Sequence, residues 1–228
     1  MKILGIETAT IVCGAAVVVD ETVLSEEQIA EKNVHAENIM RLIDEVLKQS
    51  HLSLNELDAV AVSIGPGSFT GLRIGLSVTK GLVYATGKPL VAVPTLRALA
   101  QRAVDAGVVE TQYILPAIDA RRDEVYCQLF RFNGTSIEPE WEERDLWLSR
   151  LFDEIGERSI SVTGDAIHKI QVHQEAKRLR FVTGEFASCS AGTVAMVGEQ
   201  MACMNKFVDA GTVEPKYVKE FYSTCRSN

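Results

Sequence analysis

The glycine-rich stretch GPGSFTGLRIG, residues 65–75, is the strongest structural signal in this chain. It joins an apolar segment with the length of a buried strand to a longer segment that is hydrophobic on nearly every side. Glycine permits a tight turn and a close approach of backbones, and Ser68 or Thr70 can cap a helix that follows. A phosphate-binding P-loop needs Gly and Lys where this chain has Pro66 and Leu72. The stretch therefore predicts a strand–turn–helix unit that is shaped for helix packing more than for nucleotide chemistry.

The segments around this stretch alternate between strand and helix patterns. In the first half of the chain we expect strands at 2–7, 12–19, 22–29, 58–64 and 90–93, with helices at 35–50, 70–86 and from 95 onward. In the second half we expect strands at 113–118, 124–132 and 159–163, helices at 146–152 and 188–206, and an extended tail at 215–217. This order predicts two α/β lobes, 1–105 and 106–228, each a mixed sheet with helices, and the last helix and tail can pack back on the first lobe.

Composition and charge limit the function classes. The chain has 228 residues and a formal net charge of −8, which disfavours autonomous binding to nucleic acid. Its five cysteines are odd in number and include no C-x-x-C pair, so a disulfide framework or a zinc site is not expected. No window has the roughly 20 apolar residues of a membrane span. We expect a cytoplasmic protein with no contact to a membrane.

The candidate catalytic chemistry is sparse. After the first expected strand, Glu7, Thr8 and Thr10 could face the phosphates and Mg²⁺ of a nucleotide, or they could form an ordinary polar turn. The four histidines show no metal-binding spacing, and His35 is expected to be a surface or interface group. Ser68 is not the central residue of a G-x-S-x-G motif, so it is interpreted as a helix cap. We therefore expect neither a catalytic residue nor a metal site.

Two other features admit a functional and a structural interpretation. The charged run DARRDE, residues 119–124, is either a solvated turn with local ion pairs or a contact with a partner protein or RNA. Small residues recur every fourth position along the second expected helix, at Gly67, Gly71, Gly75 and Thr79. They form one bare ridge, along which we expect another helix to pack. The other faces of this helix are also apolar, which favours a second packing surface against another subunit, although full burial within one chain is the alternative.

Several motifs together resemble one known family. The segments are ILGIETAT (3–10), the glycine-rich stretch with KGL (80–82), VPTLRALA (93–100), DARRDEVY (119–126) and, more weakly, PKYVK (215–219). This combination resembles the TsaB (YeaZ) family of bacterial tRNA threonylcarbamoyladenosine synthesis. The resemblance is strong over residues 1–130, and the glycine-rich stretch is its most specific motif.

The resemblance implies the actin/hexokinase/Hsp70-like (ASKHA) fold of two lobes. It implies an accessory subunit that pairs with the homologous catalytic subunit TsaD and with the ATPase TsaE, and that meets tRNA through this complex. The catalytic homologue carries a metal-binding H-x-x-x-H, where this chain has Thr95 and Leu99. The resemblance thus implies no activity for the chain alone and no tightly bound cofactor, although ATP or ADP could lie at the interface of the complex. Without its partner, the chain could form a homodimer.

The family's interface uses the first two helices. The residues expected there are His35, Ile39, Ile43, Gly67, Gly71, Arg73, Gly75, Thr79 and Lys80. We expect a bulky residue at Gly75 to block assembly and leave the fold intact.

Two rival functions follow from the same residues. One is a small-molecule kinase or ATPase of the same fold, in which Glu7, Thr8 and Thr10 bind Mg²⁺ and phosphate, and Gly164 with Asp165 is the weak candidate for a second phosphate loop. The other is a peptidase, which no metal motif or nucleophile elbow supports.

Overall fold

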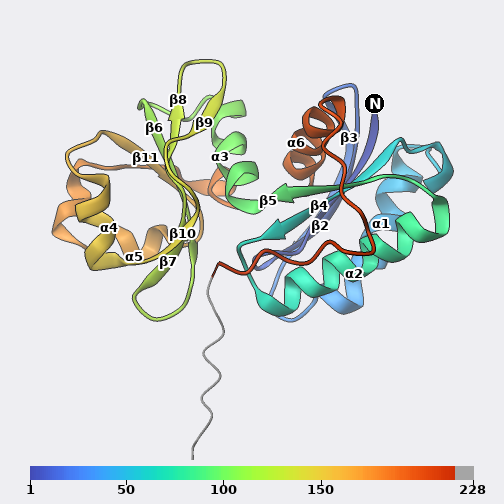
Figure 1. Cartoon of the computed structure of the whole chain (residues 1–228), viewed down its shortest axis with the longest axis horizontal. Coiled ribbons are helices and arrows are strands. Elements are labelled where there is room, and N and C mark those ends of the chain that lie inside the picture. Colours follow the sequence, from blue (N-terminus) through green and yellow to red (C-terminus); the bar gives the residue numbers. More distant parts are fainter. Residues whose placement is uncertain (219–228) are drawn as a thin grey trace, which may run out of the picture.

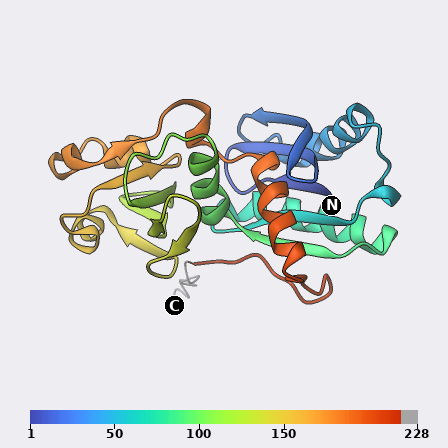
Figure 2. The same ribbon diagram turned by 90° about the horizontal axis from the view of Figure 1, so that it is seen from above.

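Two lobes lie side by side in the computed structural model, which describes residues 1–218 (Figure 1). Each lobe contains one sheet with helices against it, and the view from above shows the same division (Figure 2). The expected Lys219 at the end of the PKYVK motif, and the rest of the tail to residue 228, lie outside the described residues. Within residues 1–218, no helix is both long enough and apolar enough to cross a membrane.

The first sheet is mixed and has the strand order β3-β2-β1-β4-β5. Its strands are β1 (Lys2–Glu7), β2 (Val12–Val19), β3 (Thr22–Ala30), β4 (Ala59–Gly65) and β5 (Leu90–Pro94). β1, β2 and β3 pair antiparallel through short turns, whereas β1, β4 and β5 pair parallel because helices connect them. The central strands β1 and β4 are almost entirely buried, since helices cover both faces of the sheet.

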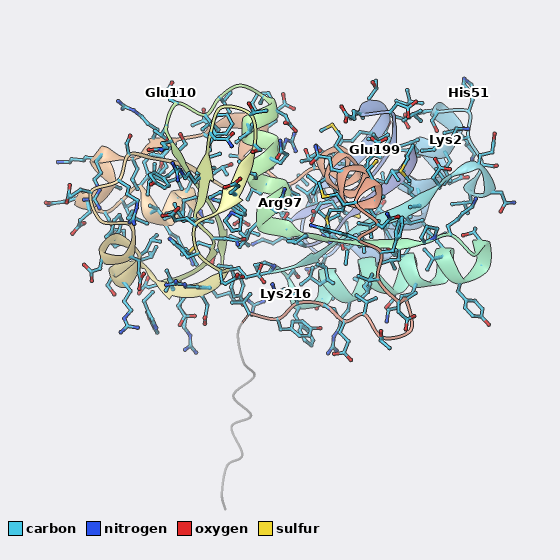
Figure 3. The ribbon with its side chains drawn as sticks, turned by 45° about the horizontal axis from the view of Figure 1, so that its top comes forward. Lys2, His51, Arg97, Glu110, Glu199 and Lys216 are labelled. Carbon is cyan, nitrogen blue, oxygen red and sulfur yellow. The ribbon has the colours of Figure 1, made fainter. Side chains whose placement is uncertain are left out.

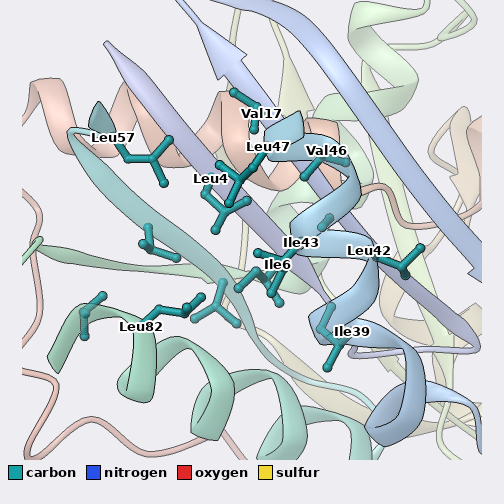
Figure 4. Close-up of a cluster of buried hydrophobic side chains, with 14 of the residues drawn as sticks. Leu4, Ile6, Val17, Ile39, Leu42, Ile43, Val46, Leu47, Leu57 and Leu82 are labelled. Carbon is teal, nitrogen blue, oxygen red and sulfur yellow. The ribbon is translucent and has the colours of Figure 1, made fainter. Parts of the chain in front are cut away.

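The helices α1 (His35–Gln49) and α2 (Phe69–Thr86) cover one face of this sheet. Their apolar side chains meet those of the strands in one cluster, which includes Leu4, Ile6, Ile39, Ile43 and Leu82 (Figure 4). The spacing of the α1 members follows the predicted helical periodicity. α1 and α2 are therefore held in place by the sheet beneath them.

The helix α6 (Ala191–Cys203) covers the opposite face of the first sheet, although it comes from the end of the chain. It approaches β1 so closely that a Cβ on Gly5 would lie 2.4 Å from the carbonyl oxygen of Ala191. Its side chains, with those of β1, β4 and β5, form a second buried cluster. α3 (Thr95–Asp105) lies between the lobes and contacts both α6 and β6.

The second sheet has the order β10-β7-β6-β11-β12, with β8 paired to β6 and β9. Its strands are β6 (Tyr113–Asp119), β7 (Glu124–Cys127), β8 (Phe130–Phe132), β9 (Ile137–Pro139), β10 (Arg144–Trp147), β11 (Ile160–Thr163) and β12 (Arg180–Phe181). The helices α4 (Leu148–Ile155) and α5 (Ile167–Ile170) lie with this sheet. Three short 3₁₀ turns are η1 (Leu54–Glu56), η2 (Gln174–Arg178) and η3 (Gly184–Ala187).

The expected single strand at 124–132 is interrupted in the structure. β7 and β8 pair with β6 in one continuous register, with Ala117 opposite Cys127 and Ile114 opposite Phe130. In that register Gln128 would stand opposite Pro116, which has no N–H to donate. The alternation of apolar residues is therefore correct as a face pattern, but the proline breaks the strand into two.

The expected helix at 146–152 was also placed too early. Its first residues belong to β10, where Leu146 pairs with Val125 of β7, and α4 starts only at Leu148. The expected helix at 188–206 starts later too, because the side chain of Ser190 caps α6 by accepting a hydrogen bond from the Thr193 N–H at 3.2 Å. The strands β9, β10 and β12 were not predicted.

After α6 the chain returns along α2 in an extended segment, residues 207–218, which we call the C-terminal strap (Figure 1). The Val208 N–H donates to the Leu90 carbonyl at 3.0 Å, and the Lys216 N–H donates to the Ile64 carbonyl at 2.8 Å. Lys216 lies at the junction of the lobes (Figure 3) and forms an ion pair with Glu143 of the second lobe. The strap thereby joins both lobes along the edge of α2.

Candidate functional site

The glycine-rich stretch is the turn from β4 into α2, as predicted. The side-chain oxygen of Ser68 accepts a hydrogen bond from the Gly71 N–H at 3.3 Å, which confirms its role as a helix cap. The Gly65 N–H donates to the side chain of Thr95 at 3.0 Å, so α3 also holds this turn. The amides of Gly65, Ser68 and Gly71 are thus used by the chain itself.

The glycine ridge of α2 lies against the turn after β1. A Cβ on Gly67 would lie 2.2 Å from the Ala9 carbonyl oxygen, and a Cβ on Gly71 would lie 2.1 Å from the Thr8 carbonyl oxygen. A Cβ on Gly75 would lie 2.1 Å from the side-chain oxygen of Thr8. The expectation that another helix packs along this ridge is therefore wrong, because the chain's own turn occupies the place.

This packing also corrects the expectation for Gly75. A larger side chain there would collide with the buried turn, so it cannot leave the fold intact. Thr79, the last member of the ridge, is fully buried and donates its hydroxyl to the Gly75 carbonyl at 2.8 Å. The ridge residues therefore pack inside the first lobe and are not available to a partner.

Glu7 and Thr8 are fully buried beneath α2. One Glu7 carboxylate oxygen accepts the Ala9 N–H at 2.5 Å, but the other oxygen, and the Thr8 hydroxyl, have no hydrogen-bond partner in the described structure. Burial raises the pKa of Glu7 to about 7, against the opposing effect of hydrogen bonds from neighbouring groups, the Ala9 N–H first among them. Thr10 is half-buried and accepts the Val12 N–H at 3.3 Å, as in an ordinary polar turn.

The cavity bordered by both lobes is too small for a nucleotide. It has a volume of about 20 Å³ and is bordered by Thr10, Leu99, Asp165 and Cys189 among others. Sites for small-molecule ligands usually have several hundred Å³. With Glu7 and Thr8 enclosed as well, the arrangement does not present a phosphate-binding surface at the three residues proposed for it.

The candidate second phosphate loop has a structural role. Gly164 has a φ of 111°, and a Cβ there would lie 2.0 Å from the Ala117 carbonyl oxygen. The Asp165 carboxylate accepts the Asp119 N–H at 2.8 Å and so holds the end of β6. These contacts explain both residues without a nucleotide.

The two residues expected where the catalytic homologue has its metal ligands are part of the core. Thr95 and Leu99 are buried at the start of α3, and the Thr95 hydroxyl is used by Gly65. Within residues 1–218, no group of His, Cys, Asp and Glu side chains is arranged to hold a metal ion. Thr95 and Leu99 offer a hydroxyl and an alkyl group, neither of which is among the usual zinc ligands, the side chains of Cys, His, Asp and Glu.

The α1 residues expected at an interface lie inside the chain. Ile39 and Ile43 are 0% and 2% exposed and belong to the cluster on the first sheet. His35 is also buried, and its Nε2 lies 3.0 Å from the Thr10 carbonyl and 3.2 Å from the Val12 carbonyl. Two carbonyl neighbours indicate that this nitrogen is protonated and donates. The expectation of a surface histidine is wrong, because His35 joins α1 to the β1–β2 turn.

What α1 and α2 expose together is a different set of apolar side chains. Met40 is 52% exposed and Tyr84 is 93% exposed, while Ile74 and Val78 are half-buried. We call this set, completed by two exposed alanines, the outer helical face: Ala36, Met40, Ile74, Val78, Tyr84 and Ala85. Ile74 and Val78 also pack against the buried cluster on the first sheet, whereas Met40 and Tyr84 are mainly exposed. The apolar excess on α2 does indicate a second packing surface. The spacing of the glycines, however, predicts that surface along the ridge, on the wrong side of the helix.

Arg73 and Lys80 lie on another flank of α2, beside the C-terminal strap. The Arg73 Nε donates to the Tyr217 hydroxyl at 2.9 Å, and its guanidinium lies 3.8 Å from the centre of the Phe69 ring. The rings of Phe69 and Tyr217 are 5.1 Å apart. A groove of about 280 Å³ between helix and strap is lined by Arg73 and Lys80 together with Pro215. Arg73 therefore anchors the strap and borders a surface next to the outer helical face.

The arrangement of the two sheets and their helices is that of the actin, hexokinase and Hsp70 class. The structure of YeaZ from Pseudomonas aeruginosa superposes with a TM-score of 0.81 at 24% identity, covering 95% of this chain and 99% of that one. The ROK hexokinase from Thermus thermophilus superposes with a TM-score of 0.50 at 12% identity, covering 89% of this chain and all of that one. These likenesses establish the two-lobe ASKHA fold.

Sequence comparison gives the family. A family model described as TsaD, tRNA N6-adenosine threonylcarbamoyltransferase, matches residues 18–221. The chain belongs to this family, within its TsaB (YeaZ) branch.

Two curated relatives are both described as tRNA threonylcarbamoyladenosine biosynthesis protein TsaB. The one from Escherichia coli K12 is 38% identical over 137 residues, which cover 60% of this chain and 58% of the relative. The one from Haemophilus influenzae is 36% identical over 126 residues, which cover 55% of this chain and 52% of the relative. The aligned part thus spans little more than half the length of these relatives.

Proposed function

We propose that this chain is a noncatalytic accessory subunit in the synthesis of N6-threonylcarbamoyladenosine in tRNA, and that it binds a homologous TsaD-type catalytic subunit. Support comes from the family and from the names of the curated relatives. The proposed work on tRNA places the protein in the cytoplasm. A TsaE-type ATPase and the tRNA would join through the complex.

The noncatalytic role is supported by the positions that would hold a metal in the catalytic homologue. Thr95 and Leu99 are buried, and neither side chain carries the imidazole, thiolate or carboxylate group of a usual zinc ligand. The enclosed Glu7 and the 20 Å³ cavity also argue against a small-molecule kinase or ATPase. Any ATP or ADP used by the assembly would then lie at a surface shared with a partner.

The observation that carries the proposal is the outer helical face. A monomer exposes single apolar side chains routinely, but several of them gathered on two adjacent helices indicate a candidate protein interface. Here Met40 and Tyr84 are more than half exposed, and Ile74 and Val78 are half-buried on α2. A pair of helices from a homologous subunit could bury this face by packing across α1 and α2.

The buried residues of the original interface prediction would act behind this face. Ile39, Ile43 and the ridge glycines fix how α1 and α2 lie on the sheet, so they set the shape of the face without touching a partner. In the absence of the catalytic subunit, the same face could close a symmetric homodimer.

The test is co-purification with the TsaD-type subunit of the same organism. We expect the double variant Met40→Asp/Tyr84→Asp to weaken binding at least 10-fold, because two charges would be desolvated in an apolar contact. Both side chains are exposed, so the free variant keeps its fold, which circular dichroism checks. Val172→Asp is the matched control, since Val172 is 75% exposed in the second lobe.

The functional arm measures modified nucleosides in tRNA from cells depleted of the chain. Threonylcarbamoyladenosine should fall on depletion, return with the wild type or Val172→Asp, and stay low with the double variant. Unchanged modification after depletion would refute the proposed function. Normal binding by the double variant would refute the outer helical face as the interface.

A further inference from the structure

The turn between β6 and β7 contains two consecutive arginines in an unfavourable backbone conformation. Arg121 has a φ of 67° and Arg122 a φ of 49°, which places both in the left-handed region. Only a few per cent of residues other than glycine adopt it, and Asn, Asp and His are the usual exceptions. Glycine would be the natural choice at either position.

Neighbouring groups hold this turn in place. The Arg121 N–H donates to the Asp119 carboxylate at 2.6 Å, and the Glu124 N–H donates to the Arg121 carbonyl at 3.2 Å. The Lys169 ammonium donates to the Arg122 carbonyl at 2.6 Å and pairs with Asp119 as well. All of these contacts use the backbone of the two arginines. They fix the turn but give no reason for an arginine side chain.

The two side chains are available for a ligand. Both residues are exposed, and within residues 1–218 neither guanidinium forms a hydrogen bond or an ion pair. The β2–β3 turn offers a comparison, since Asp20 and Glu21 are left-handed there too, with φ of 48° and 62°. In that turn the Asp20 carboxylate binds the amino-terminal ammonium of Met1, so a contact within the chain accounts for the residue.

The charges around the turn leave a cationic tip. Asp119 is paired with Lys169, and Glu124 is only 7% exposed. Among the described residues, Asp123 is the exposed carboxylate next to Arg121 and Arg122 in the sequence. Within residues 1–218 the fixed loop thus presents two guanidinium groups without a partner, although the net charge of the chain is −8. A planar guanidinium matches the geometry of phosphate and donates two parallel hydrogen bonds to it.

We propose that Arg121 and Arg122 bind phosphate groups of the tRNA backbone when the complex binds its substrate. Phosphate contacts position a nucleic acid without reading its sequence, which suits a subunit that does no chemistry on the base. The identity of the ligand as tRNA rests on the proposed function. The location of the site rests on the turn alone.

The experiment measures binding of an unmodified tRNA transcript to the reconstituted complex of this chain with its TsaD-type subunit, between 50 and roughly 300 mM KCl. Each lost phosphate contact lowers the slope of log K against log salt by about 0.7 to 0.9. We therefore expect Arg121→Gln/Arg122→Gln to lower the slope by about 1.5 and to weaken binding several-fold at 100 mM KCl on the same principle. The matched control is Arg150→Gln on α4, which is also exposed.

A glycine variant separates function from structure. Arg121→Gly removes the unfavourable conformation, so we expect the Tm to rise by about 2–4 °C while tRNA binding weakens. If Arg121→Gly and Arg121→Gln/Arg122→Gln both bind tRNA with the slope of the control, the proposal is overturned. If the double variant loses the TsaD-type subunit instead, the turn contacts an acidic protein surface, which also overturns it.

Two further arms identify the source of the phosphate and keep the inference apart from the proposed function. Inorganic triphosphate should not displace the transcript at concentrations below those of general salt competition, and displacement at micromolar triphosphate would assign a nucleotide site. If the wild-type chain forms no complex with the TsaD-type subunit, the proposed function fails. In that case the same salt series is measured with the chain alone. Equal slopes of log K against log salt for the wild type and the double variant would exclude phosphate binding by the turn.

Discussion

The buried Glu7 predicts an unusual dependence of stability on pH. Its pKa rises from 4.5 to about 7 in the folded chain, chiefly because burial disfavours the charged carboxylate. Between pH 4.5 and 7 the folded state therefore holds a proton that the unfolded state has lost. A group that binds more protons when folded makes the free energy of unfolding fall as pH rises. The difference between 4.5 and about 7, at about 1.4 kcal/mol for each pH unit, corresponds to about 3 kcal/mol.

Replacing the carboxyl group by a neutral amide removes this dependence. In Glu7→Gln the amide oxygen can still accept the Ala9 N–H, while the NH₂ group replaces an oxygen that has no partner in the described structure. An unpaired neutral donor costs less than an unpaired charge, about 1–3 kcal/mol against several. We therefore expect Glu7→Gln to be more stable than wild type by about 1–3 kcal/mol at pH 8 and not at pH 4.5.

Urea unfolding followed by circular dichroism at both pH values checks this result. Glu56→Gln is the control with the opposite sign, because hydrogen bonds from Ser53 lower the pKa of that exposed carboxyl group. Its contribution is present above the pKa of the unfolded chain and is lost as pH falls through the lower folded value. Parallel stability curves for Glu7→Gln and wild type would show that Glu7 stays charged when folded, and would refute the reasoning.

Two other predictions concern the packing of α2. Gly71→Ala should destabilise the chain by several kcal/mol in urea unfolding, because its Cβ would lie 2.1 Å from the Thr8 carbonyl oxygen. Gly81→Ala on the same helix should stabilise it by about 0.5–1 kcal/mol, since a Cβ there meets nothing within 4 Å, and equal effects of the two variants would contradict the packing described. Tyr217→Phe removes the acceptor of the Arg73 Nε hydrogen bond, so amide exchange in the C-terminal strap should become several-fold faster, whereas unchanged exchange would mean that this hydrogen bond does not hold the strap.

Local patterns in the sequence were enough to predict most of the first lobe. The alternation and length of the apolar segments predicted the bounds of β1, β2 and α1 within about one residue, because the spacing of apolar residues differs between strands and helices. The serine cap of α2 was predictable for the same reason, because it depends on neighbours three residues apart. The second lobe was harder. Pro116 interrupts a strand that lies far from it in sequence, and β9, β10 and β12 have only two to four residues each.

The periodicity of the sequence did not predict which segment packs against each face of a helix. The spacing of Gly67, Gly71 and Gly75 correctly predicted a close contact along α2. It did not predict that the turn at Thr8 makes this contact, because that turn comes from about sixty residues earlier in the chain. Likewise, nothing near His35 indicates that two carbonyls of another turn will surround it. Such contacts arise only when distant segments are folded together.

Sequence alone thus determined most elements of the first lobe, the two-lobe class and the family, since these depend on local periodicity and on the family's motifs. Tertiary structure alone decided which sides of α1 and α2 are covered and which remain free. It also enclosed Glu7 and left Arg121 and Arg122 exposed on a fixed turn. The physical reason is that the burial of a residue depends on contacts with segments from the whole chain, whereas the local sequence pattern reflects only residues a few positions away.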